Sequence, residues 1–177
     1  MSNYRKVSPY ELSMNPAEEI GHGWMLVSAA LPEGDVFGRD YNTMTAGWGG
    51  IGELWGRPVA FVFVRPERHT YRFTEESPYI TLTFLGNERR DALSLCGSLS
   101  GRDTDKAKLC GLVPIFTELG DGRAVYFEGA RRVLILKKLY AAPLDTSKFI
   151  DAALMRYYES DGVHKMYVCE IVTALEE

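Results

Sequence analysis

Short stretches of alternating or continuous apolar residues, separated by glycine, proline and asparagine, recur along the whole chain. This pattern is typical of β-strands joined by turns. Residues 59–64 are apolar without interruption, so we expect that strand to be covered on both faces. Asp121-Gly122 predicts a hairpin, and further turns are expected at 32–35, 49–52 and 56–58. The predicted strands span 24–31, 41–48, 59–64, 79–85, 113–119, 124–128, 133–140 and 165–174.

Four short helices are expected between the strands. Thr70 is a candidate N-cap of the first, which Ser77-Pro78 would end, and Asn87 is a candidate N-cap of the second. The segment 101–106 separates the second helix from a short third one, and the fourth and longest is expected over 146–162. Apolar residues recur at helical spacing in the second helix (Ala92, Leu95, Cys96, Leu99) and in the fourth (Phe149, Ile150, Ala153, Leu154, Tyr157, Tyr158).

Hairpins dominate the order of these elements, which argues against regular alternation of strands and helices. About seven strands with short helices between them predict a mainly antiparallel barrel or sandwich with peripheral helices. Residues 1–20 are expected to form an irregular arm, in which Pro16–Glu19 is able to open a helical turn. Because no internal repeat, low-complexity segment or linker is present, we expect one domain over residues 1–177.

Composition removes several classes of function. The net charge is −4, and no block of Lys and Arg forms the basic stripe that nucleic acids need. The apolar run at 24–31 is too short to cross a bilayer, and no membrane association is expected. Three widely spaced cysteines indicate free thiols in a reducing compartment, so the protein is predicted to be cytoplasmic. Neither the cysteines nor the three histidines have metal-ligand spacing, so no metal site is predicted.

The stretch Asn42-Thr43-Met44-Thr45-Ala46-Gly47-Trp48 is the first candidate for chemistry. It places small hydroxyl residues, a carboxamide, a glycine and a large aromatic on a predicted strand. Small side chains let a flat polar ligand approach the backbone N–H and C=O groups, which a strand presents at fixed spacing. The alternative is a core strand with a buried Trp, since Thr and Trp are ordinary strand residues.

Residues 47–52 also satisfy the G-x-G-x-x-G pattern of dinucleotide-binding proteins, and Glu67 lies twenty positions after Gly47. That motif functions only where it joins a buried strand to a helix. Residues 40–46 before it are polar, and Gly56 and Pro58 follow it closely. No crossover helix fits, so we interpret the match as chance.

Three ordered blocks give the chain a resemblance to the flavin reductase-like FMN-binding family, most closely to its flavoredoxin-type branch. They are residues 42–48, Arg-Pro-x-Arg-x-Thr-Tyr at 65–71, and Ser-Gly-Arg-Asp-Thr-Asp-Lys at 100–106. The resemblance runs from about residue 23 to residue 112 and more weakly to the last strand. It implies an antiparallel, Greek-key split β-barrel that forms a homodimer and binds FMN near the subunit interface.

Carried over residue by residue, the resemblance implies that the first block lines the isoalloxazine ring, with main-chain groups of Thr45, Ala46 and Gly47 at its polar edge and Trp48 close to it. Cations, a hydroxyl and a helix start in the second block suit a dianionic phosphate, although lone surface arginines are usually just solvated. The third block is either a further phosphate-side segment or a capped surface helix. The predicted FMN-binding residues are Asn42, Thr43, Met44, Thr45, Ala46, Gly47, Trp48, Arg65, Arg68, His69, Thr70, Ser100, Gly101, Asp105 and Lys106.

The sequence departs from the family on the side where a substrate would bind. Residues 82–84 read Leu-Thr-Phe where relatives often have an Asn, and residues 141–143 read Ala-Ala-Pro where a His often follows the strand. His164, near the last strand, is either a substitute polar group or a histidine at the edge of the core.

The resulting hypothesis is an FMN-dependent oxidoreductase that takes a hydride from NADH or NADPH and passes electrons to free flavin, a partner protein or a small acceptor. No catalytic side chain is predicted, because the reactive chemistry belongs to the flavin. A non-catalytic FMN-binding electron carrier is the main alternative. Two others are an oxidase of the pyridoxamine phosphate type and a barrel that has lost the flavin.

Overall fold

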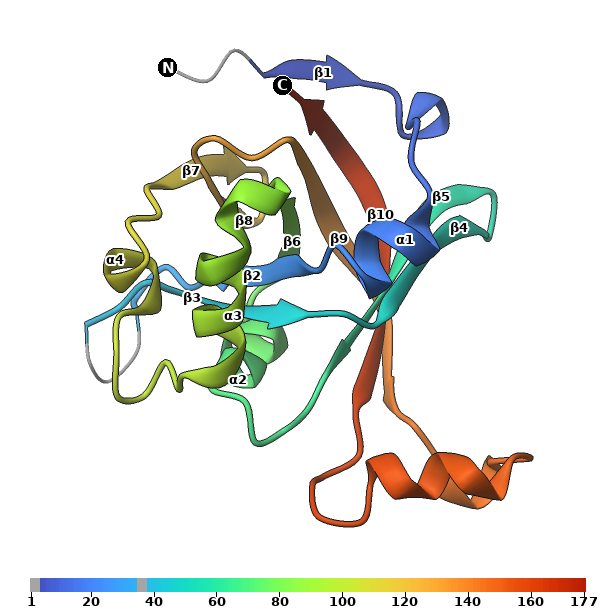
Figure 1. Ribbon diagram of the computed structural model, residues 1–177. Helices are drawn as coiled ribbons and strands as arrows, with labels where there is room; N and C mark the ends of the chain where they lie inside the picture. Colours follow the sequence, from blue (N-terminus) through green and yellow to red (C-terminus); the bar gives the residue numbers. More distant parts are fainter. Residues whose placement is uncertain (1–3, 35–37) are drawn as a thin grey trace.

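The described part of the chain is built mainly of antiparallel strands. The computed structural model describes residues 4–34 and 38–177, so Asp35 of the predicted turn at 32–35 lies outside it. Seven strands follow one another in the order β3-β2-β6-β9-β10-β5-β4, β1 pairs with β10, and β7 and β8 form a separate ribbon (Figure 1). The strands are β1 (Arg5–Val7), β2 (Met25–Ala30), β3 (Tyr41–Ala46), β4 (Gly49–Leu54), β5 (Arg57–Val64), β6 (Tyr79–Phe84), β7 (Pro114–Leu119), β8 (Gly122–Phe127), β9 (Arg132–Pro143) and β10 (Lys165–Glu176).

Short helices pack around this sheet, as the sequence predicts. Figure 1 shows α3 in front of β2 and β3, and α1 beside β4 and β5. No helix among the described residues is long and apolar enough to cross a membrane. The α-helices are α1 (Pro16–Gly21), α2 (Thr70–Glu76), α3 (Arg90–Ser98) and α4 (Lys106–Leu109), and the 3-10 helices are η1 (Pro9–Glu11), η2 (Asn87–Arg89), η3 (Thr146–Lys148) and η4 (Ala152–Tyr157).

Apolar side chains form one core inside the curved sheet and a second between its outer face, α3 and the β7–β8 ribbon. Val27, Val62 and Leu134 belong to the first, and Leu93 and Phe127 to the second. All three cysteines are free, and Cys96 packs in the second core as predicted. The prediction that the strand at 59–64 is covered on both faces is wrong, because Phe61 and Phe63 on one face are only half-buried.

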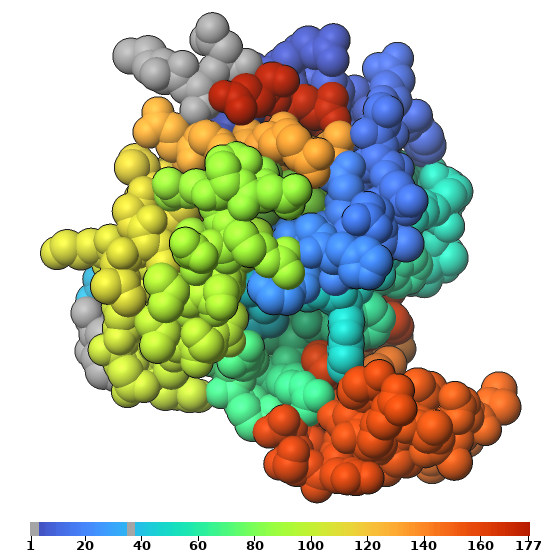
Figure 2. All heavy atoms as spheres, viewed as in Figure 1, coloured from blue at the N-terminus to red at the C-terminus, as the bar shows by residue number. Residues whose placement is uncertain are grey.

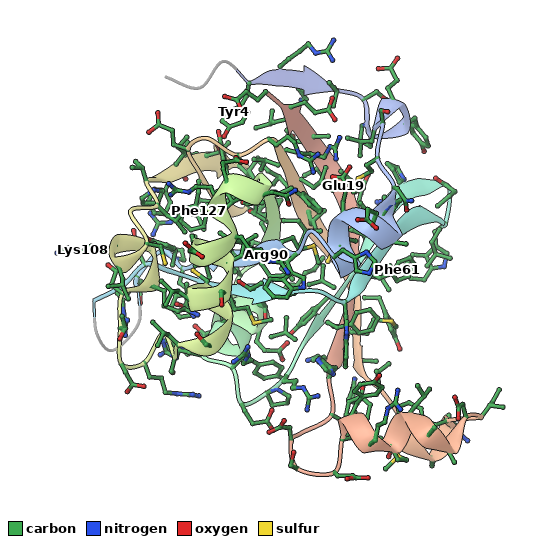
Figure 3. The ribbon with its side chains drawn as sticks, in the orientation of Figure 1. Tyr4, Glu19, Phe61, Arg90, Lys108 and Phe127 are labelled. Atoms are coloured by element: carbon green, nitrogen blue, oxygen red, sulfur yellow. The ribbon has the colours of Figure 1, made fainter. Side chains whose placement is uncertain are left out.

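Residues 4–20 of the N-terminal arm include β1, η1 and most of α1, which corrects the prediction of an irregular segment for this part of the arm. β1 pairs with the end of β10, beyond the part of β10 that pairs with β5. The Tyr4 hydroxyl donates to the carbonyl of Phe127 and accepts from Ala130 N (Figure 3). The helical turn at Pro16 is confirmed as α1, with Asn15 as its N-cap.

The predicted turn at residues 49–52 is wrong, because these residues belong to β4. β4 pairs with β5 through a turn at Trp55 and Gly56, both with positive φ. Gly49 suits this strand because the chain is crowded at that position: a Cβ on Gly49 would lie 2.9 Å from the carbonyl oxygen of Phe61. Since a strand, not a helix, follows Gly47, the rejection of the dinucleotide-binding motif is confirmed.

This crowding gives a test with a matched control. Gly49→Ala is expected to lower the free energy of unfolding by about 1–3 kcal/mol, because a backbone oxygen has to move to admit the methyl group. Gly52→Ala, on the same strand but with open space around its Cα, is expected to have little effect. Urea denaturation of both variants measures the difference, and equal midpoints would contradict the close approach at Gly49.

Two predicted N-caps are wrong by a few residues. His69, not Thr70, is the N-cap of α2, and Gly86, not Asn87, precedes the 3-10 turn η2 that leads into α3. On α3 the buried residues are Ala92, Leu93 and Cys96, while Leu95 faces solvent. Thr70 is instead the first residue of α2, and its hydroxyl bonds with Asn42.

The long fourth helix is the largest error of the prediction. Residues 146–162 form two short 3-10 helices, η3 and η4, capped by the carboxylates of Asp145 and Asp151. They stand at the tip of the β9–β10 hairpin and project from the rest of the molecule (Figure 2, orange). Ile150 is fully exposed, so the apolar periodicity does not reflect one packed helix face within this chain.

Candidate flavin site

Two adjoining hollows lie where β3 and β5 end. The larger has a volume of ≈ 480 Å³ and the smaller ≈ 160 Å³, and they share Met44, Glu67 and Arg68. Together they form one elongated cleft. The larger is lined by Met44, Thr45, Ala46, Gly47, Trp48, Phe63, Arg65, Glu67, Arg68, Asp161 and His164, and the smaller by Met44, Glu67, Arg68, His69, Thr70, Ser98, Leu99, Ser100, Gly101, Arg102 and Lys106.

The floor of the larger hollow is the end of β3 and the two residues that follow it. The prediction that this strand reaches residue 48 is wrong, since β3 ends at Ala46. The Thr45 hydroxyl donates to the Leu93 carbonyl and so ties the strand to α3. Trp48 is 45% exposed, which excludes a buried core Trp, and its ring lies 5.1 Å from that of His164 and 5.2 Å from that of Tyr157.

Asn42 connects the three sequence blocks from behind the cleft. Its amide is buried and donates to the Thr70 hydroxyl at 2.9 Å. The third block also lies against Asn42, because a Cβ on Gly101 would collide with the Asn42 amide. Thr43 is also buried and accepts from Ser28 Oγ at 2.8 Å. Neither Asn42 nor Thr43 lines the elongated cleft; both border a separate hollow of ≈ 20 Å³.

Cations gather around the smaller hollow. Arg68 donates to the Gly97 carbonyl at 2.7 Å and borders both hollows. Lys106 is 5% exposed, and its Nζ donates to the Cys96 carbonyl at 3.0 Å. Burial lowers the pKa of Lys106 to about 8, and the positive charge of Arg68 acts in the same direction. Arg102, which sequence reasoning missed, also borders this hollow and donates to the Glu67 carbonyl.

Asp105 lies away from the cleft. Its carboxylate accepts from Lys108 N at 3.0 Å and caps α4, and it borders only the small separate hollow. Of the two interpretations of the third block, the capped surface helix is therefore the one that holds at Asp105. His69 does border the cleft, and its ring packs against Phe73 at 5.5 Å.

Arg65 borders the larger hollow, but its guanidinium faces the segment Tyr157–Gly162, which precedes β10. It donates to the carbonyls of Tyr157 at 2.7 Å and Gly162 at 3.2 Å, and lies 3.5 Å from the Asp161 carboxylate. Sequence reasoning missed this segment as part of the site. No pattern pointed to it, because its role depends on contacts across about 95 residues of chain.

His164 lies at the inner end of the larger hollow and is 8% exposed. Burial, together with the positive charge of nearby Arg65, lowers the pKa of His164 to about 4, so the imidazole is neutral at neutral pH. Its Nδ1 is buried without a hydrogen-bond partner among residues 4–34 and 38–177. The same described residues include no group of three or more His, Cys, Asp or Glu able to hold a metal ion.

No protein-family model and no curated protein sequence matches this chain. Solved structures match along most of its length. An FMN-binding domain of a flavin reductase-like enzyme from Shewanella baltica is 18% identical, with a TM-score of 0.67, covering 98% of this chain and 77% of that one. A flavoredoxin from Methanosarcina acetivorans is 19% identical, with a TM-score of 0.65 and coverage of 88% and 68%.

A Streptomyces globisporus NADH:FAD oxidoreductase is 15% identical, with a TM-score of 0.63 and coverage of 88% and 80%. These likenesses show the fold: the chain is a mainly antiparallel split barrel of the kind found in FMN-binding flavin reductase-like proteins and flavoredoxins. The fold class that the sequence predicts is confirmed.

Proposed function

We propose that this protein is an FMN-binding oxidoreductase that accepts a hydride from NADH or NADPH. The observation that carries the proposal is the elongated cleft, which is cationic at one end and aromatic at the other. FMN has a matching form, with a dianionic phosphate at one end and a flat ring at the other. The FMN named for the Shewanella neighbour and the NADH named for the Streptomyces neighbour support the same choice.

The residues present fit FMN in both parts of the cleft. Arg68, Lys106 and Ser100 would hold the phosphate, because charge-assisted donors bind phosphate oxygens strongly. The main chain of residues 44–48 would orient the ring. Bound flavin supplies the hydride chemistry, as flavins do in general. The protein's part is to bind and orient the ring and, through Trp48, to exclude water from one side of it.

Turnover with a nicotinamide donor tests the enzyme against the electron carrier. FMN-loaded protein is expected to oxidise NADH or NADPH in the presence of free flavin as acceptor. Oxidation of neither donor by protein that holds FMN would favour the electron carrier, a function that the flavoredoxin neighbour's name also suggests. Turnover of a phosphorylated amine instead would favour the pyridoxamine-phosphate type of oxidase.

The low pKa of Lys106 predicts that FMN binding depends on pH. Above its pKa of about 8 the free lysine is neutral and must take up a proton to pair with the phosphate, so affinity falls as pH rises. Between about pH 7 and pH 9 we expect roughly a tenfold loss, the size of one charge-assisted bond. Titrations at several pH values measure it. Lys106→Met is expected to bind weakly at every pH, and a wild-type-like slope in that variant would contradict the assignment.

We also propose that two copies of the chain pair through the projecting tip of the β9–β10 hairpin. Exposed apolar side chains gather on this tip, and one of them, Tyr157, packs against Trp48 of the cleft. Ile150→Asp combined with Leu154→Asp is expected to convert a dimer of 19.9 kDa chains to monomers and to weaken FMN binding, as sedimentation velocity and flavin titration would show. Ser160→Asp, on the same segment, is the control. A wild-type protein that sediments as a monomer would contradict the pairing.

A further inference from the structure

The segment Tyr157–Gly162 borders the larger hollow. It leads from the projecting η4 back to β10, and its Asp161 lines the hollow. On its inner side the ring of Tyr158 lies 5.7 Å from that of His164, which Trp48 and Phe63 also flank. Removing the segment would open this end of the hollow to solvent.

Two residues that follow β5 hold the segment in place. Arg65 contacts it three times, through the carbonyls of Tyr157 and Gly162 and the carboxylate of Asp161. Glu67 accepts from Gly162 N at 2.8 Å. A Cβ on Gly162 would meet the Glu67 carboxylate, so a larger residue there would require the Glu67 side chain to shift. The donors of Arg65 are therefore directed at the protein's own segment, while Arg68 and Arg102 border the smaller, cationic hollow.

The space behind the segment has the properties of a ligand compartment. Trp48 and Phe63 line it, Tyr158 packs against His164, and among the described residues the buried Nδ1 of His164 has no hydrogen-bond partner. A buried polar atom without a partner is costly, so a ligand atom that pairs with it gains affinity. A neutral imidazole between aromatic rings suits a flat conjugated ring that carries a neutral carbonyl or carboxamide group.

We propose that Arg65 is a positioning residue: with Glu67 it holds Tyr157–Gly162 as the wall of a compartment for such a ring, next to His164 and apart from the phosphate end at Arg68. This role rests on the proposed function, since the ring would exchange electrons with flavin on the floor formed by residues 44–48. It differs from the phosphate contact that the sequence resemblance implies for Arg65.

Limited proteolysis tests the clamp without flavin. Arg156 is exposed and directly precedes the segment, so trypsin cleavage after it reports how firmly the segment is held. Arg65→Met is expected to accelerate cleavage there by roughly tenfold, the equivalent of about 1.4 kcal/mol. Arg57→Met, which removes a surface pair with Glu170 at the other end of β5, is the control. Equal cleavage rates in the two variants would overturn the clamp.

Kinetics and flavin titration test the compartment. In Arg65→Met we expect FMN affinity within about twofold of wild type, KM for NADH or NADPH raised about tenfold, and little change in kcat. Arg68→Met is expected to weaken FMN binding instead. His164→Phe is expected to raise the same KM, and His164→Asn, which keeps a hydrogen-bonding group, to restore most of it.

The opposite pattern would overturn the proposal. If Arg65→Met weakens FMN binding as much as Arg68→Met and leaves KM unchanged, Arg65 belongs to the phosphate site. A wild-type protein that binds no FMN would refute the proposed function, and the trypsin comparison would still decide whether Arg65 holds the segment.

Discussion

Arg132→Met is expected to lower the free energy of unfolding by about 2–4 kcal/mol, because it removes a buried guanidinium from two half-buried carboxylates. Arg132 is 6% exposed and joins three separate parts of the chain. Its guanidinium pairs with Glu19 on α1 at 2.6 Å and with Glu176 on β10 at 2.7 Å, and it donates to the Ser13 carbonyl at 3.0 Å. Denaturant unfolding of the purified variant measures the loss.

The neighbouring arginine provides the control. Arg131 pairs with the same Glu19 carboxylate at 2.8 Å, but 56% of its side chain is exposed. A pair in water contributes little, so Arg131→Met is expected to cost about 0–1 kcal/mol. If the two variants lose equal stability, burial is not what gives Arg132 its importance.

The second large effect concerns the cofactor. Combining Asn42→Ala with Arg68→Ala is expected to weaken FMN binding by at least about a hundredfold. Arg68 loses charge-assisted bonds to the phosphate, and loss of the Asn42 amide disconnects β3 from Thr70. Fluorescence titration with FMN measures the change, and unchanged affinity would contradict the site.

Two comparisons separate a contact of Arg68 with the phosphate from a general effect on the fold of the cleft. Arg68→Ala alone is expected to weaken binding of FMN but not of riboflavin, which has no phosphate. Arg72→Ala changes an exposed residue of α2 that pairs with Glu76, and is expected to leave binding of both flavins unchanged. If Arg68→Ala weakens both flavins equally, the residue acts on the fold of the cleft and not on the phosphate.

Period-two patterns and turn residues were sufficient to predict most strands. The Asp121-Gly122 hairpin between β7 and β8 and the antiparallel arrangement are both confirmed. β4 was missed because three of its six residues are glycines, which are typical of a turn. The close approach of Phe61 at Gly49 is a contact that no local pattern records. The helix expected at 146–162 failed because its apolar residues share no single packing face within this chain. Ile150 is fully exposed, whereas the rings of Tyr157 and Tyr158 pack against those of Trp48 and His164.

The candidate site was predictable where the sequence blocks are contiguous. All three blocks reach the cleft or its immediate support, although Asn42, Thr43 and Asp105 lie behind it or beside it. The wall at Tyr157–Gly162 was not predictable, because it is held by the side chains of Arg65 and Glu67, which lie far from it in the sequence. The cofactor itself stays a prediction.

The most direct measurement of that prediction is the visible absorption spectrum of protein purified without added cofactor, followed by denaturation and identification of any released chromophore. We predict a flavin spectrum and release of FMN. A colourless protein that also fails to bind added FMN would contradict the proposed function and leave a split barrel with a different ligand in its cleft.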